Sequence, residues 1–172
     1  MRKDPVHSLA HEAAMLSAIV ESAADAIISK DLNGIIQTWN SGAERLFGYS
    51  AGEVIGKPVT ILFPPGSEEE EPGILARLGL GECIHPYETV RRRKDGSLLD
   101  ISLTVSPVRD SAGRIVGASK IARNITDRKE AVRQLRESEQ RLTELLAAIP
   151  AAIYTTDADG KITYFNEAAV EF

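Results

Sequence analysis

Residues 31–49 read DLNGIIQTWNSGAERLFGY and contain the features that decide the fold. Asn33 and Gly34 stand between two short apolar runs, and this dipeptide indicates a hairpin turn because both residues tolerate positive φ. Asn40 is a typical helix N-cap, since its side-chain oxygen can accept hydrogen bonds from backbone N–H groups one turn on. The stretch therefore predicts a β-hairpin that leads directly into a helix over residues 41–47.

Two further helices are predicted on either side of this stretch. Residues 8–23 have helical periodicity, and their apolar stripe comprises Leu9, Ala13, Leu16, Ile19 and Val20. A helix over residues 72–78 is indicated because Pro72 suits the first helical position. The acidic run Glu68–Glu71 before it is interpreted as the solvated start of this helix, because carboxylates suit its positive end; the alternative is a cation site.

The region after residue 84 has the two-residue periodicity of β-strands. Apolar and polar residues alternate strictly over 99–106, which is typical of a half-buried antiparallel strand, and further strands are predicted over 85–93 and 115–125. The basic run Arg91–Lys94 is interpreted as a solvated hairpin, since neighbouring strand residues point to opposite faces; the alternative is a site for phosphate or acidic partners. Hairpins with helices segregated between them predict an α+β domain, in which helices cover one face of an antiparallel sheet.

Residues 127–149 are again helical in pattern and stop at Pro150. Two series of residues seven apart form an imperfect heptad seam, namely Ile125, Val132, Glu139 and Leu146, and Arg128, Leu135, Leu142 and Ile149. An internal repeat follows, because residues 151–172 match residues 25–46, with Asn166 at the place of Asn40. We therefore expect a second copy of the same domain to begin near Leu146, and a longer parent protein whose effector lies beyond Phe172.

Composition excludes several classes of protein. The 172 residues are 43% hydrophobic and 26% charged, as in ordinary folded domains, and the net charge of −5 argues against a general nucleic-acid binder. The single cysteine, Cys83, cannot form an intramolecular disulfide or a cysteine-rich zinc site. No apolar run approaches the roughly 20 residues of a membrane span, and no signal-peptide core follows the N-terminus. We expect a cytoplasmic protein with no membrane and no nucleic-acid partner.

The motifs of residues 31–129 resemble those of PAS domains. In chain order they are Asp31-x-x-Gly34-x-Ile36, Trp39-Asn40, Ala43-x-x-Leu46-Phe47-Gly48-Tyr49, Glu53-x-x-Gly56-Lys57, Arg93-Lys94-Asp95-Gly96-Ser97 and Asn124-Ile125-Thr126-Asp127-Arg128-Lys129. The resemblance covers about residues 15–129, with a second partial copy from about residue 146. It implies the PAS fold, a five-stranded antiparallel sheet with helices on one face.

The resemblance also implies a function. PAS domains sense small molecules, light or redox state, dimerise, and pass signals to kinase or cyclic-dinucleotide output domains. We therefore expect a sensory and dimerisation module of a bacterial-type signalling protein, such as a two-component sensor histidine kinase, that relays a ligand or conformational signal to a downstream effector domain of the same chain. The alternatives are the input module of a cyclic-dinucleotide cyclase and a ligand-free assembly scaffold. No catalytic constellation can be argued, so the chain itself is not expected to be an enzyme, although its parent protein could be a kinase.

The expected organisation has four segments. They are an N-terminal helical extension (1–14), a PAS domain (15–126), a coiled-coil-like linker helix (127–149) and the start of a second PAS domain (150–172). A homodimer is expected through the N-terminal and linker helices. The residues expected to relay a signal are Asn124, Ile125, Thr126, Leu135 and Leu142. PAS domains usually carry aspartate where this chain has Asn124, so we expect a neutral hydrogen bond in place of the usual salt bridge.

No cofactor or metal is expected. Flavin-binding relatives need an Asn-Cys-Arg sequence soon after Gly56, where this chain continues Lys57-Pro58-Val59. Haem-binding relatives place a histidine on the helix predicted over 72–78, which has none; the nearest, His85, stands at a strand start. Between the helices and the sheet a fully packed core is favoured, because protein interiors are normally close-packed, and an apolar small-molecule pocket is the alternative. Its candidate residues are Ile36, Phe47, Ile61, Leu75, Leu78, Leu103, Val105 and Ile121.

Overall fold

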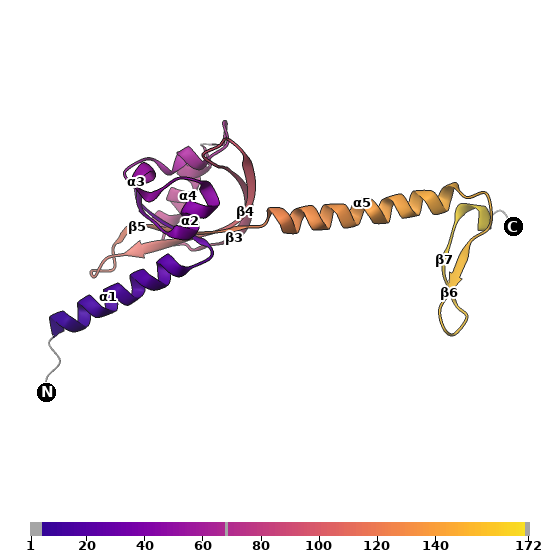
Figure 1. Ribbon diagram of the computed structural model, residues 1–172, viewed down its shortest axis with the longest axis horizontal. Helices are drawn as coiled ribbons and strands as arrows, with labels where there is room; N and C mark the ends of the chain where they lie inside the picture. The colour runs from indigo at the N-terminus through magenta and orange to yellow at the C-terminus, as the bar shows by residue number, and fades with distance from the viewer. Residues whose placement is uncertain (1–4, 68, 171–172) are drawn as a thin grey trace. The chain divides into compact units, whose positions relative to one another are not determined.

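The computed structural model describes residues 5–67 and 69–170 and divides into two units, Met1–Thr126 and Asp127–Phe172. The first unit contains a five-stranded antiparallel sheet with the strand order β2-β1-β5-β4-β3 (Figure 1). Its strands are β1 (Ala26–Asp31), β2 (Ile36–Trp39), β3 (Ile84–Arg92), β4 (Leu98–Arg109) and β5 (Ile115–Asn124). Its helices are α1 (Pro5–Ser22), α2 (Ser41–Phe47), α3 (Ala51–Val54), the 3-10 helix η1 (Val59–Leu62) and α4 (Glu70–Gly79).

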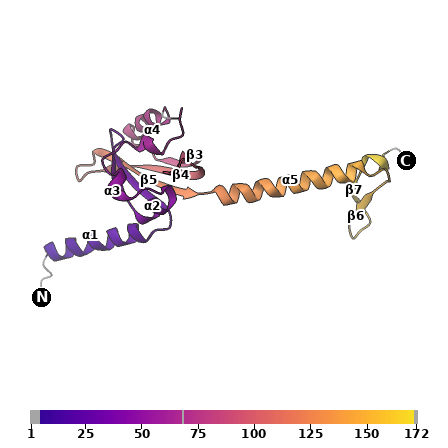
Figure 2. The ribbon, with the colours of Figure 1, turned by 45° about the horizontal axis from the view of Figure 1, so that its top comes forward.

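Helices α2, α3 and α4 gather against the curved sheet, as two views of the ribbon show (Figures 1 and 2). The expected α+β architecture, with a five-stranded antiparallel sheet and helices, is confirmed. The predicted N-terminal extension falls partly on residues 1–4, and the predicted second domain partly on residues 171–172; both parts lie outside the described residues. Within the described parts of the chain, no helix is long and apolar enough to cross a membrane.

The hairpin between β1 and β2 forms where the sequence predicts it, but with a different turn. Gly34 has the positive φ that the turn requires, +80°, whereas no non-glycine residue in the described ranges, Asn33 included, has positive φ. The carboxylate of Asp31 closes the turn instead, since its Oδ1 accepts hydrogen bonds from the N–H groups of Asn33 and Ile35, both at 2.9 Å. A side chain that binds its own turn in this way removes the need for a second left-handed residue.

Asn40 joins the hairpin to α2 and is 1% exposed. Its Oδ1 accepts hydrogen bonds from the N–H groups of Ile27 on β1 and Ala43 on α2, both at 2.9 Å. Its Nδ2 donates to the carbonyl of Val20 in α1 at 2.8 Å. The predicted N-cap is therefore confirmed, and the same side chain also fixes the end of α1.

The apolar core lies between the helices and the inner face of the sheet. On β5 the buried residues are Gly117, Ala118, Lys120 and Ala122, and from Ala118 onward they alternate with more exposed neighbours. Ile121 was expected on this inner face, and that prediction is wrong: the residue is 42% exposed and pairs with Ile27 across the sheet. Because side chains of a strand alternate between faces, a lysine takes the inner position beside it.

The second unit consists of α5 (Thr126–Ala148), which begins at the last residue of the first unit, and the two-stranded sheet of β6 (Tyr154–Thr156) and β7 (Ile162–Phe165), followed by the 3-10 helix η2 (Glu167–Ala169). Asn166 has the hydrogen bonds of Asn40, since it accepts from the N–H groups of Ile153 and Ala169 and donates to the carbonyl of Leu146. The internal repeat seen in the sequence is therefore also a repeat of the hydrogen-bond network.

Candidate functional site

Three cationic side chains lie on the inner face of the sheet, in the middle of an apolar core. Lys30 on β1, Arg91 on β3 and Lys120 on β5 are 2%, 2% and 3% exposed. Each occupies an inward position of its strand: Lys30 continues the buried series of Ala26 and Ile28. Buried cations are costly unless they are paired, so the contacts of these three define the site.

Helix α4 supplies the carboxylates. Glu71, itself 5% exposed, forms an ion pair with Lys30 through Oε1 and with Lys120 through Oε2, the latter at 2.9 Å. The neighbouring Glu70 forms an ion pair with Arg91 at 2.8 Å, and the Glu70 side chain remains 39% exposed. We call these five residues (Lys30, Glu70, Glu71, Arg91 and Lys120) the ion cluster. Its contacts connect the first turn of α4 to three strands.

A small cavity adjoins the ion cluster. Its volume is about 10 Å³, which is room for about one water molecule. Arg91 and Lys120 supply its charged lining, and both also face the ring of Phe63, at 4.2 Å for the Arg91 guanidinium carbon and 5.8 Å for Lys120 Nζ. The other lining residues are apolar: Ile28, Phe47, Val59, Leu62, Phe63, Ile101, Leu103 and Ala122.

The electrostatic state of the two lysines follows from their surroundings. Burial and, to a smaller extent, the nearby positive charge of Lys120 together lower the pKa of Lys30 to about 6. Burial likewise lowers the pKa of Lys120 to about 7, with the Arg91 guanidinium acting in the same direction. Desolvation penalises the charged form of an amine, and a neighbouring cation adds to that penalty. The two ammonium groups therefore titrate near neutral pH.

The pocket residues predicted from the sequence are only partly brought together. Phe47 and Leu103 line the cavity. The others do not line it: Ile36, Leu78 and Val105 are buried elsewhere in the core, Ile61 and Leu75 are half-buried, and Ile121 is on the outer face. That these residues bind a ligand stays a prediction.

The residues of the ion cluster were missed in the sequence. The interpretation of residues 68–71 as a solvated helix start is wrong for Glu71, and that of residues 91–94 as a solvated hairpin is wrong for Arg91, because both side chains are buried. The available signal was strand alternation on β1, where Lys30 follows the apolar residues Ala26 and Ile28 at intervals of two.

A shallow groove runs between α4 and β3 on the outside of the ion cluster. Its volume is about 450 Å³, and its lining comprises Glu70, Gly73, Ile74, Arg77, Ile84, His85 and Tyr87. The Tyr87 hydroxyl is buried and makes no hydrogen bond within the described ranges, and burial raises its pKa. The Glu70–Arg91 ion pair joins the linings of the two hollows, because Glu70 lines the groove and Arg91 lines the inner cavity.

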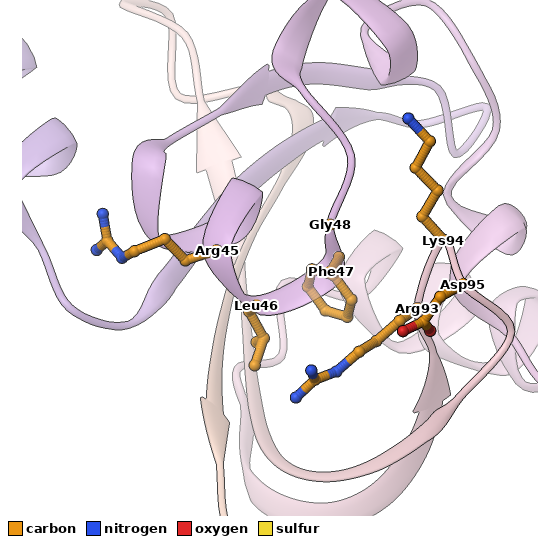
Figure 3. A pocket seen from close by; sticks show the side chains of 7 residues that line it. All are labelled: Arg45, Leu46, Phe47, Gly48, Arg93, Lys94 and Asp95. Carbon is orange, nitrogen blue, oxygen red and sulfur yellow. The ribbon is translucent and has the colours of Figure 1, made fainter.

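A separate hollow of about 250 Å³ lies between the end of α2 and the turn that joins β3 to β4. Figure 3 shows Arg93 extending toward Leu46, whereas the side chain of Lys94 points away. Lys94 is instead paired with Glu53 at 2.5 Å. With its lysine already neutralised and its rim open to solvent, this hollow offers less to a ligand than the ion cluster does.

The junction between β5 and α5 is fixed by short-range hydrogen bonds. Asn124 Oδ1 accepts from the N–H of Thr126 at 3.0 Å, and the Thr126 hydroxyl accepts from the N–H of Asp100 on β4 at 3.1 Å. The side chain of Asn124 thus makes the neutral hydrogen bond that was expected from the sequence. Ile125 is 5% exposed and anchors the junction in the first unit.

Helix α5 has no buried residue. Leu135 and Leu142 are 60% and 59% exposed, and Leu145 is 60% exposed. A helix with a low mean hydropathy and an exposed apolar stripe gains little stability by itself, because isolated helices are marginal in water.

Comparisons with known proteins agree with this architecture. A family model described as the PAS fold matches residues 14–125, and one described as a PAS domain matches residues 140–172. Two-component system protein A of Emericella nidulans is 36% identical over 135 residues, and the signal transduction histidine-protein kinase AtoS of Escherichia coli is 32% identical over 133 residues; each match covers 76% of this chain. The crystal structure of a PAS domain from Colwellia psychrerythraea superposes with a TM-score of 0.61 and 33% identity, over 67% of this chain and 98% of that one.

The chain spans about a fifth of the length of the curated relatives, 20% of the first and 21% of the second.

Proposed function

Because the chain belongs to the PAS family, in which its relatives include sensor kinases of two-component systems, we propose that its first unit senses a signal and relays it through α5. The effector in this proposal is a histidine kinase domain of the same protein, and the working form is a homodimer. The observation that carries the proposal is the exposed apolar stripe of α5, which directly follows a sheet strand that reaches the ion cluster.

A continuous connection between core and helix supports the relay. Strand β5 carries Lys120 on its inner face and ends at Asn124, whose side chain begins α5 by binding Thr126. A shift of β5 at Lys120 therefore reaches the first turn of α5 through four residues of chain and one hydrogen bond. Coupling of this kind needs an element with two arrangements of similar energy, and a helix pair interrupted by polar seam residues has that property.

A second copy of the chain is the partner that fits the stripe. The helix before each PAS copy carries leucines at matching places, because Leu9 and Leu16 align with Leu135 and Leu142 at the offset of the internal repeat. Leu16, Leu135 and Leu142 are each 59–60% exposed. A leucine stripe thus precedes each copy of the repeat. In a parallel coiled coil between two chains, each helix meets the same helix of the other chain through identical positions.

The test is a double substitution on α5. Leu135→Asp with Leu142→Asp places two charges on the stripe and is expected to shift the full chain from dimer to monomer in light scattering. The β-sheet signal in circular dichroism should stay unchanged, because neither residue contacts the sheet's core. The matched control is Gln134→Asp with Gln140→Asp, which adds the same charges on the same helix away from the stripe and should stay dimeric.

If Leu135→Asp/Leu142→Asp stays dimeric like its control, the result contradicts the relay through α5. Because Leu16 belongs to an equivalent stripe, the same comparison is made with Leu16→Asp added, so that pairing through α1 cannot conceal the result.

A ligand-free assembly module is the second candidate, and one observation favours it. The inner cavity has room for about one water molecule, so a larger ligand can enter only if the core rearranges. This candidate predicts a dimer through α5 that no small molecule alters.

A further inference from the structure

We propose that the ion cluster binds a small carboxylate with an apolar body, which takes the place of Glu71 between Lys30 and Lys120 and thereby releases α4. This inference rests on the proposed sensory function and names the class of its ligand. Glu71 then acts as an internal ligand, holding α4 on the sheet until an external carboxylate replaces it.

The cavity beside the cluster has the polarity of an anion site. Its charged lining consists of Arg91 and Lys120, and both side chains carry only hydrogen-bond donors. Its remaining lining residues are apolar, so an occupant must present an acceptor to one side and an apolar body to the other. A carboxylate with a short hydrocarbon part meets both demands.

The exchange leaves the charge of the cluster unchanged. Three basic side chains, Lys30, Arg91 and Lys120, face two carboxylates, Glu70 and Glu71. A bound carboxylate that takes the place of Glu71 keeps this count, so both lysines again have the carboxylate partner that a buried ammonium group requires.

Glu71 shows that a carboxylate fits between the lysines. Beyond its Cα, the side chain of a glutamate has the carbon skeleton of propionate, and here it reaches both Lys30 and Lys120. Withdrawal of Glu71 requires movement of α4, whose other anchors in the core are Ile74 and Leu78. The helix is flanked by glycines at Gly66 and Gly81, both with positive φ, which are suitable places for a change of backbone direction.

The groove between α4 and β3 is the route to the site. Glu70 lines this groove and is partly exposed, and the Arg91 that it pairs with lines the inner cavity. An incoming carboxylate meets Arg91 first by exchanging with Glu70, whose carboxylate can return to water, and then reaches Lys120 behind it. Glu70 pairs with Arg91 again once the ligand has moved on to the lysines, so each step exchanges one carboxylate for another.

The probe is propionate, with propionamide as its neutral isostere and sodium chloride at the same ionic strength. In the full wild-type chain, propionate is expected to shift the amide resonances of Leu103 and Lys120 and to accelerate amide hydrogen exchange at Ile74 and Leu78 in α4. Propionamide and chloride should do neither. Equal responses to propionate and chloride would overturn the proposal, since they would show only general screening of charge.

Glu71→Gln removes the competing carboxylate and keeps the side-chain volume. We expect this variant to bind propionate at least tenfold more tightly than the wild type, and Lys120→Met in the same background to abolish the gain. Glu82→Gln, which removes an exposed carboxylate paired with Arg77 after α4, is the matched control and should bind like the wild type. If Glu71→Gln is unfolded without ligand, we expect propionate to induce its folding and propionamide not to do so. Failure of propionate to induce folding would contradict the proposal.

Binding should also depend on pH. As pH rises from 6 to 8 the lysines lose their protons, so the affinity for propionate should fall by up to about tenfold per pH unit for each proton taken up on binding. The charged and titratable groups around the two amines are Asp31 on β1, Glu70 and Glu71 on α4, Tyr87 and Arg91 on β3, and the amine of the other lysine. An affinity that does not change over this range would contradict binding to the ammonium groups.

This test is separate from the test of the relay. If the wild-type chain does not bind propionate but Leu135→Asp/Leu142→Asp is monomeric, only the proposed ligand class is contradicted. Propionate binding in a chain whose dimer does not depend on α5 removes the relay alone.

Discussion

At the scale of single residues, Lys30 and Lys120 stand out because burial of a charged amine lowers the free energy of unfolding. A group whose pKa is lower in the folded than in the unfolded chain binds fewer protons when folded. Between the lowered values, about 6 for Lys30 and about 7 for Lys120, and the ordinary lysine value of about 10.4, the unfolded state therefore holds more protons. The free energy of unfolding must then increase as pH rises through this window.

We expect the free energy of unfolding, measured by urea titration, to rise between pH 7 and pH 9 by up to about 1.4 kcal/mol per pH unit for each lysine. Lys30→Met should remove one lysine's share of this slope. Lys57→Met, which removes an exposed lysine, is the matched control. A wild-type slope of zero, or the same slope in Lys30→Met, would show that the buried amine does not titrate differently in the two states.

At the scale of elements, the sequence of α4 itself does little to stabilise the helix. Its N-cap, Glu69, makes no side-chain capping hydrogen bond, and its interior contains Gly73, a residue that weakens helices by roughly 1 kcal/mol relative to alanine. A Cβ at Gly73 meets no atom within 4 Å, and its φ is not in the left-handed region. The helix is therefore held mainly by Ile74, Leu78 and the ion cluster.

Gly73→Ala is accordingly expected to stabilise the first unit by about 0.5–1 kcal/mol in thermal or urea unfolding. It should also slow amide exchange in α4 and weaken propionate binding, because release of the helix becomes harder. Gly113→Ala adds the same methyl group at a φ of +78°, again with no atom within 4 Å, and should instead destabilise. Stabilisation by both substitutions, or by neither, would contradict this account of α4.

At the scale of the whole molecule, the two copies of the repeat allow a direct comparison. The N–H groups of Ile27 and Ile153 both donate to an asparagine Oδ1 at 2.9 Å. The first belongs to a five-stranded sheet with a packed face, and the second to a two-stranded sheet whose strand residues are nearly all exposed. Two strands alone are marginal in water, so the shared hydrogen bond is embedded in very different surroundings.

We expect the amide of Ile153 to exchange with solvent orders of magnitude faster than that of Ile27 in the dilute full chain. Hydrogen exchange followed by NMR measures both amides in one sample, so the first copy is the internal control for the second. Slow exchange at Ile153 and Ile162 in dilute monomer would mean that this hairpin is stable without further strands.

The amino-acid sequence alone was sufficient to predict the features that depend on residues close together in the chain. The hairpin at Gly34, the cap at Asn40, the stripe of α5 and the repeat of Asn40 at Asn166 are all local patterns, and each is present where it was predicted. Hydrogen bonds and side-chain periodicity over a few residues suffice to specify them.

Only the tertiary structure decided which face of β5 is buried and what the charged residues do there. Strand β5 has an apolar residue at Ile121 and small ones at Ala118 and Ala122, so its pattern alone favours the wrong face, and Lys120 is recognised as internal only once β5 lies between β1 and β4. Glu71 meets Lys30 and Lys120 because the lysine side chains of β1 and β5 reach the first turn of α4, which is far from both strands in the chain. A carboxylate and an amine look solvated in sequence, since the pairing that permits their burial is made between distant segments.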